Sequence, residues 1–170
     1  MIRKAAVLLT LALIQPAAAD PATLLGVFQN WSAYSSGSGS EMTCYALSQP
    51  RATQPKGAKR TPIYLMVSDW PGRKVKAEPQ IVLGYPVKDN APAALAVGSA
   101  KFAFFARPNG SDGSAWLQAL GDNGRLMETM GKGVSVVASG VSARGTKTSD
   151  TYSLAGFPEA LGKIHDVCKM

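Results

Sequence analysis

The chain has 170 residues, of which 46% are apolar, 17% are charged and 8% are aromatic, with 17 glycines and 11 prolines. This length and apolar content are typical of one globular domain with a hydrophobic core, and they exclude a disordered chain. Lys and Arg number 18 against 11 Asp and Glu, which gives a net charge of +7, but charge alone identifies no class of partner.

Residues 1–19 have the pattern of a secretory signal peptide. Arg3 and Lys4 supply positive charge, an apolar stretch follows, and three alanines precede the expected cleavage point after Ala19. The apolar stretch is shorter than the about 20 residues needed to cross a membrane, and no later run is long enough either. We therefore expect residues 20–170 to form a soluble mature domain, without a transmembrane segment, that is periplasmic or secreted.

Most of the mature chain is predicted to form short strands separated by Gly, Pro, Ser and Asn. In chain order the strands are expected at 28–34, 42–47, 63–68, 80–85, 101–106, 134–139 and 146–154. Residues 49–60 contain two prolines, a glycine and four basic residues, so they are expected to form an exposed basic loop. Strands of this length and spacing are typical of an antiparallel β-sandwich or barrel-like domain.

Two segments are predicted to be helical. In residues 123–131, apolar side chains recur at one-turn spacing before glycines that end a helix. Near the C-terminus, Gly156 is expected to relieve the turn into a helix, and Pro158 suits the first helical turn. The apolar residues of this terminal helix are Leu161, Ile164, Val167 and Cys168. Because they fall near one face, we expect that face to pack on the sheet.

The two cysteines, Cys44 and Cys168, are predicted to form a disulfide, because thiols pair in the oxidising compartment that an exported chain enters. Such a bridge would pin the C-terminal helix to an early strand. The alternative is a nucleophilic or metal-binding thiol, which needs a nearby base or further ligands that the sequence does not display.

The sequence offers few groups for catalysis. His165 is the single histidine, and its place on the terminal helix predicts a partly exposed residue rather than a catalytic base. One His and two paired Cys exclude a zinc site of His and Cys ligands, so no metal or cofactor is expected. Most acidic residues are expected on solvated turns, but sequence spacing cannot establish whether two carboxylates face each other across a cleft. A hydrolase with paired carboxylates therefore stays open as the enzymatic alternative.

The C-terminal third resembles a known family, and shorter earlier segments resemble it too. The similar segments are Gly131–Gly133, Val136–Thr146, Asp150–Phe157 with a helix centred on Ala160, and earlier Trp31–Tyr34, Cys44–Ala46 and Val67–Ser68. On these residues the chain resembles the invasion-associated locus B family, most distinctively over 142–157. The resemblance implies a protein exported by alphaproteobacteria with an all-β, sandwich-like domain, and some members are linked to the entry of pathogens into host cells. Many relatives carry additional cysteines, and the family supplies no established catalytic residues.

These observations together predict a non-enzymatic exported envelope protein with a binding role, and the resemblance implies host-cell association or invasion. Arg144 and Lys147, in a polar and cationic loop, are expected to bind an anionic envelope or host-surface component. Trp70 and Tyr152 are expected to supply anchor surface. No nucleic-acid partner is expected for an exported chain. The alternatives are a periplasmic glycan hydrolase and a structural envelope protein without a discrete ligand.

Overall fold

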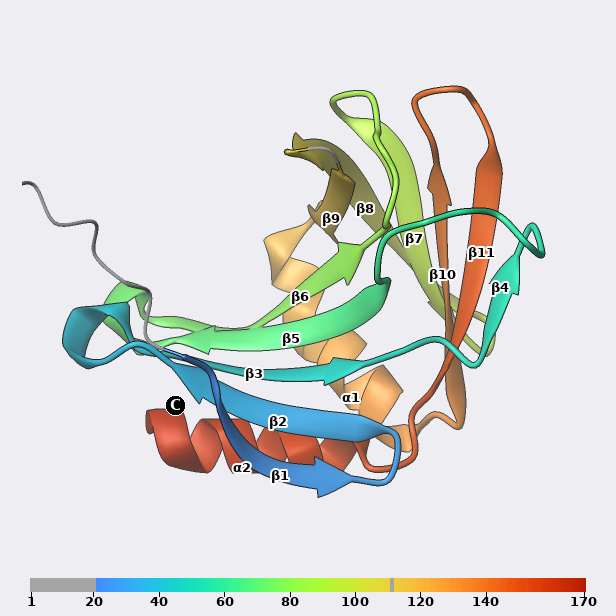
Figure 1. The fold of residues 1–170 in the computed structure, drawn as a ribbon. Helices are drawn as coiled ribbons and strands as arrows, with labels where there is room; N and C mark the ends of the chain where they lie inside the picture. The colour runs from blue at the N-terminus through green and yellow to red at the C-terminus, as the bar shows by residue number, and fades with distance from the viewer. Residues whose placement is uncertain (1–20, 111) are drawn as a thin grey trace, which may run out of the picture.

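The computed structural model describes residues 21–110 and 112–170, so the predicted signal peptide lies outside the described residues. A single antiparallel sheet of eleven strands makes up most of the described chain, with two α-helices beside it (Figure 1). The predicted fold class is confirmed: the domain is mainly β, with two helices and one disulfide. Its strands form one open, strongly bent sheet.

The strands follow one another across the sheet in an order that departs from the chain order in its second half. The first five neighbours are β1 (Thr23–Phe28), β2 (Trp31–Ser36), β3 (Thr43–Ser48), β5 (Tyr64–Trp70) and β6 (Val75–Val82). The sheet continues through β9 (Asp112–Leu117), β8 (Ala100–Asn109), β7 (Ala91–Val97), β10 (Ser135–Val141), β11 (Lys147–Ser153) and β4 (Ala52–Gln54). The helices are α1 (Asn123–Lys132) and α2 (Phe157–Cys168). Both helices were predicted at these positions.

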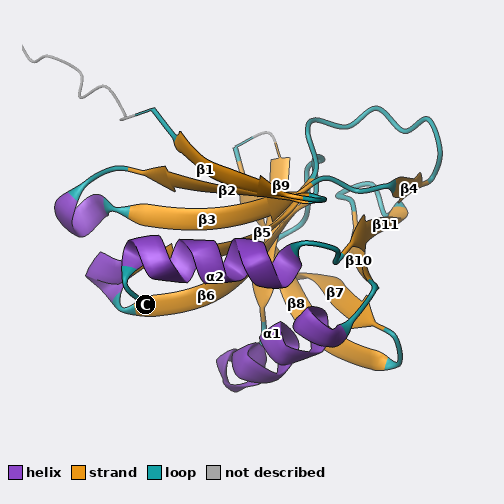
Figure 2. Cartoon of the chain, turned by 90° about the horizontal axis from the view of Figure 1, so that it is seen from below, coloured by secondary structure: helices purple, strands orange, loops and turns teal. Residues whose placement is uncertain are grey.

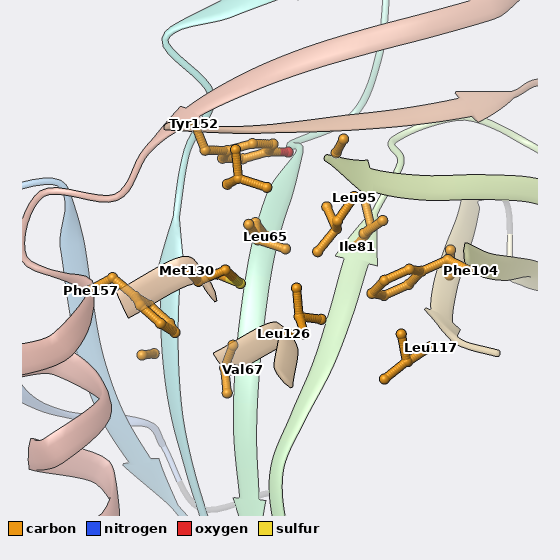
Figure 3. Close-up of a cluster of buried hydrophobic side chains, with 14 of the residues drawn as sticks. Leu65, Val67, Ile81, Leu95, Phe104, Leu117, Leu126, Met130, Tyr152 and Phe157 are labelled. Atoms are coloured by element: carbon orange, nitrogen blue, oxygen red, sulfur yellow. The ribbon is translucent and has the colours of Figure 1, made fainter. Parts of the chain in front are cut away.

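One face of the bent sheet, which we call the inner face, encloses the core. α2 packs against β1, β2, β3 and β5, and α1 packs against β6 (Figure 2). Side chains alternate between the two faces of each strand, so every second residue points inward. The buried side chains include Leu65, Val67, Ile81, Leu95, Phe104, Leu117, Leu126, Met130 and Phe157 (Figure 3). The opposite, outer face carries no helix in the described part of the chain (Figure 2).

The start of α2 is joined to the β1–β2 turn. The indole Nε1 of Trp31 donates a hydrogen bond to the Ser153 carbonyl at 2.9 Å, and the Trp31 and Phe157 ring centroids are 4.8 Å apart. Gly156 precedes the helix with a φ of +88°. The predicted turn into the terminal helix is therefore also a tertiary contact with the first hairpin.

The far end of α2 is held by two links to the sheet. The predicted disulfide joins Cys44 of β3 to Cys168, with a Cα–Cα distance of 6.0 Å and a sequence separation of 124 residues. His165 is partly exposed, as predicted, and its Nδ1 lies 2.7 Å from Oδ2 of the fully buried Asp69. Asp69 also accepts a hydrogen bond from the Ala77 amide at 2.8 Å. Asp69 lies directly opposite Cys44 in the strand register, so the two links hold the same end of α2 against neighbouring strands. His165 thus helps to orient the helix.

Several strands differ from the sequence prediction. The strand expected at 28–34 is divided between β1 and β2, because Gln29, with a φ of +51°, forms a turn with Asn30. β7 was missed because its alanines and Pro92 have low strand propensity, and β9 begins at an Asp-Gly pair that is typical of a turn. β6 begins earlier than the strand expected at 80–85 and ends at Val82.

Candidate functional site

The β10–β11 hairpin presents the two cations that the sequence predicted to bind a ligand. Its turn is held by backbone hydrogen bonds from Ser142 to Thr146 at 2.9 Å and from Ala143 to the Pro86 carbonyl at 2.7 Å. Arg144 and Lys147 are both exposed, and neither forms an ion pair with a described residue. The turn therefore holds two unneutralised cations on an ordered backbone.

A hollow of about 730 Å³, which we call the hairpin groove, lies on one side of this hairpin. Its walls come from residues 55–61, residues 84–86 and the hairpin turn. Arg144 and Lys59 bring positive charge to it, and Asp112 is the one carboxylate residue among its described lining. The groove therefore favours a negatively charged occupant.

A buried ion pair lies beneath the hairpin groove. The guanidinium of Arg60 donates to both carboxylate oxygens of Asp150 at 2.7 Å and to the Leu83 carbonyl at 2.7 and 3.1 Å. The side chains of Arg60 and Asp150 are 5% and 0% exposed. This corrects one expectation, since Arg60 belongs to a loop expected to be exposed, and it makes Asp150 an exception to the expectation that most acidic residues lie on solvated turns. The two charges are buried because each neutralises the other.

Tyr85 forms a polar cluster with the Arg60–Asp150 ion pair and Thr148. Its ring lies 4.9 Å from the Arg60 guanidinium carbon, and its hydroxyl is 2.7 Å from the Thr148 hydroxyl. Burial raises the pKa of the Tyr85 phenol above its ordinary value, although the Thr148 hydrogen bond and the Arg60 charge act in the opposite direction. The phenol is therefore neutral at physiological pH, and the polar cluster carries one compensated pair of charges.

The substitution Arg60→Ala is expected to lower the free energy of unfolding by about 3 kcal/mol, because Asp150 would remain buried without its cation. Urea denaturation measures this loss. Lys59→Ala is the matched control: it removes an exposed neighbouring cation and should change stability by less than about 0.5 kcal/mol. Equal losses for the two variants would show that the ion pair contributes nothing particular to the fold.

A second hollow of about 1070 Å³, which we call the outer-face trough, lies on the other side of the hairpin. It runs along the outer face of β8, β7, β10 and the start of β11, and its cations are Lys101, Arg107 and Lys147. Lys147 therefore belongs to the trough, whereas Arg144 belongs to the hairpin groove. The two cations predicted as one patch serve two different hollows.

The expected anchor residues lie elsewhere. Tyr152 is 0% exposed on the inner face, so its assignment as surface was wrong; the alternation along β11 turns it toward the core (Figure 3). Burial raises the pKa of its phenol far above the ordinary value. Trp70 is half-buried, donates from Nε1 to Glu78 at 3.0 Å, and lies 4.1 Å beneath the Arg73 guanidinium. It lines neither hollow beside the hairpin, so its role as an anchor stays a prediction for a separate surface.

The described carboxylates do not gather in the hollows. Asp112 lines the hairpin groove, Glu128 lines a third hollow beside α1, and no acidic residue lines the outer-face trough. In residues 21–110 and 112–170, no group of three or more His, Cys, Asp or Glu residues could hold a metal ion. None of the helices in the same ranges is long and apolar enough to span a membrane.

The sequence matches no protein-family model and no curated protein. Among solved structures, the crystal structure of invasion associated protein B from Bartonella henselae is similar to this chain, with a TM-score of 0.59. The chain has the fold of invasion associated protein B. The match covers 85% of this chain and 98% of that one, at 14% sequence identity. The fold implied by the sequence resemblance is thus confirmed, and at this identity the likeness to invasion associated protein B extends to the fold alone.

Proposed function

We propose that this chain is a non-enzymatic exported envelope protein that binds an anionic surface component at the β10–β11 hairpin. The observation that carries the proposal is the hairpin itself. Its backbone is held by hydrogen bonds, and it presents Arg144 at a groove that also receives Lys59. Neither cation is paired with a carboxylate in the described part of the chain, so both are available to a ligand.

Two further observations support export and the association with a surface. The Cys44–Cys168 disulfide fits an oxidising compartment outside the cytoplasm, in agreement with the signal peptide expected at residues 1–19. The solved protein with the same fold is described as invasion associated, and host-cell association is accordingly part of this proposal.

The distribution of carboxylates favours a binder over a glycan hydrolase. Glycosidases that use two carboxylates hold them about 5–9.5 Å apart across the substrate. Two carboxylates are fully buried among the residues that the structure describes, Asp69 and Asp150, and they are occupied by His165 and Arg60. None of the three hollows described above is lined by two carboxylate residues.

Binding to an anionic polymer tests the proposal. Immobilised heparin serves as the anionic glycan. We expect the purified protein to bind it at low salt and to be released at high salt, because salt screens the attraction between exposed charges. The hairpin variant, Arg144→Glu with Lys59→Glu, reverses the charge of the two exposed groove cations and should weaken binding at least about tenfold. Lys76→Glu with Lys163→Glu is the control, since it makes the same change of charge away from the hairpin.

The outcomes separate the three functions. Unchanged binding by the hairpin variant, or equal losses in both variants, would show that the hairpin is not the binding surface. A wild-type protein that captures nothing from envelope extract at low salt would favour a structural envelope protein. Release of reducing sugar from envelope glycans, lost on substitution of a carboxylate, would instead establish the hydrolase.

A further inference from the structure

The outer-face trough exists because small side chains follow one another across neighbouring strands. Ala94 of β7 lies directly opposite Ala103 of β8 and Ser139 of β10, and Ser149 of β11 continues this row. Ala94 is 7% exposed although it is not part of the inner core cluster. It is therefore shielded by taller neighbours on the outer face, as expected at the bottom of a trough.

The dimensions of the trough suit an elongated occupant. Lys101 and Arg107 are six residues apart on β8, which corresponds to about 20 Å along the strand. From β8 through β7 and β10 to Lys147 of β11 the trough spans three strand spacings, or about 14 Å. Its volume of about 1070 Å³ is at the upper end of small-molecule sites. A hollow that is longer than it is wide, with Ala94 and Ala103 in its floor, fits an alkyl chain better than a compact polar ring.

The cations are distributed unequally along the trough. Arg107 lies toward the end where Pro92 of β7 is opposite Phe105, and its guanidinium carbon is 5.2 Å from the Phe105 ring centroid. Lys147 is opposite Val141, two residues beyond Ser139, and so lies toward the same end. None of the trough cations forms an ion pair with a described residue, and no carboxylate of residues 21–110 or 112–170 lines the trough. This end therefore attracts an anion next to an apolar floor.

We propose that the outer-face trough binds a single-chain anionic lipid. The alkyl chain runs parallel to β8, over Ala94 and Ala103 and past Pro92 and Phe105, and the phosphate of the headgroup lies between Arg107 and Lys147. Lys101, at the opposite end, covers the chain with its methylene stem while its ammonium group stays in water. The site is separate from the hairpin groove and does not depend on Arg144.

Lysophosphatidylglycerol, below its critical micelle concentration, is the probe for titration calorimetry with the disulfide-bonded protein. Lysophosphatidylcholine of the same chain length lacks the net charge, and glycerol 3-phosphate lacks the chain. We expect lysophosphatidylglycerol to bind at least about tenfold more tightly than either, because only this probe uses both the apolar floor and the cations. Equal affinity for glycerol 3-phosphate would reduce the trough to a simple anion site and overturn the proposal, as would equal affinity for lysophosphatidylcholine.

Variants locate the chain and the headgroup. Ala103→Phe fills the trough at an exposed position and should abolish binding without lowering the melting temperature, whereas Ala119→Phe adds the same ring outside it. Arg107→Glu should weaken binding at least about tenfold. Arg144→Glu should leave lipid binding unchanged, which separates this site from the proposed glycan surface. Full binding by Ala103→Phe would overturn the proposal.

A spectroscopic measurement places the chain independently of affinity. Trp116 of β9 lies directly opposite Phe105, beside the trough. A lysophosphatidylglycerol brominated in its chain should quench the fluorescence of Trp116, and Trp116→Phe should remove the quenched component. Binding that quenches equally in wild type and Trp116→Phe would place the lipid elsewhere on the protein and contradict the assignment.

Discussion

Alanine at position 156 is expected to lower the free energy of unfolding by about 4 kcal/mol or more, which would leave little folded protein at 37 °C. The residue has a φ of +88°, in the left-handed region that costs a non-glycine residue about 1–2 kcal/mol. A Cβ atom there would also overlap the carbonyl oxygen and carbon of Phe28. Because these are backbone atoms, they cannot move aside as a flexible side chain would, and the β1–β2 turn must separate from the start of α2.

Gly145 provides the matched control for this substitution. Its φ of +87° is nearly the same, but a Cβ atom there would meet no atom within 4 Å. Gly145→Ala should therefore cost only the backbone contribution of about 1–2 kcal/mol. Urea denaturation and the far-ultraviolet circular dichroism of both variants measure the difference. Similar losses at the two positions would show that contact with Phe28 does not constrain the corner.

Both helices and the disulfide could be predicted because their signals are local or chemically exclusive. The apolar periodicity of residues 123–131, and Pro158 before an apolar face, mark helices within a few residues. Cys44 and Cys168 permit one intramolecular pairing, so an oxidising compartment was sufficient to predict it. None of these predictions required knowledge of which strands are neighbours.

The missed strands depend on distant partners instead. β7 is rich in alanine, yet it pairs with β8 on one side and β10 on the other, so the backbone hydrogen bonds of its neighbours stabilise it despite weak propensity. The Arg60–Asp150 pair joins residues 90 positions apart, which no short pattern can indicate. Likewise, the burial of Tyr152 follows from the direction in which β11 faces the core, which the sequence leaves open.

The cations of the two hollows could likewise be predicted from the sequence only in part. Arg144 and Lys147 were predicted as cations of one loop, but the hairpin separates them between the hairpin groove and the outer-face trough. Lys101 and Arg107 were missed, although the alternation over residues 101–107 places both on the same face of a strand. The charge pattern was therefore visible in the sequence, whereas the row of small residues that makes a trough was visible only after the strand register was known.

Removal of the disulfide by Cys44→Ala with Cys168→Ala is expected to lower the free energy of unfolding by about 4–5 kcal/mol in the chain-entropy model, because the bridge closes a loop across 124 residues. The loss arises mainly in the unfolded chain, which gains freedom when the loop opens. The folded variant should keep its sheet, since α2 stays packed through Phe157 and Ile164.

Urea denaturation of the double alanine variant and the oxidised wild type measures the loss, and thiol titration in denaturant confirms that the wild type has no free thiol. Hydrogen exchange should increase most in the last turn of α2, where His165 and Asp69 remain as the second link to the sheet. A loss below about 1 kcal/mol would contradict the loop-closure argument. A uniform increase in exchange across the sheet would instead show that the bridge maintains the folded state as a whole, and not the docking of one helix end.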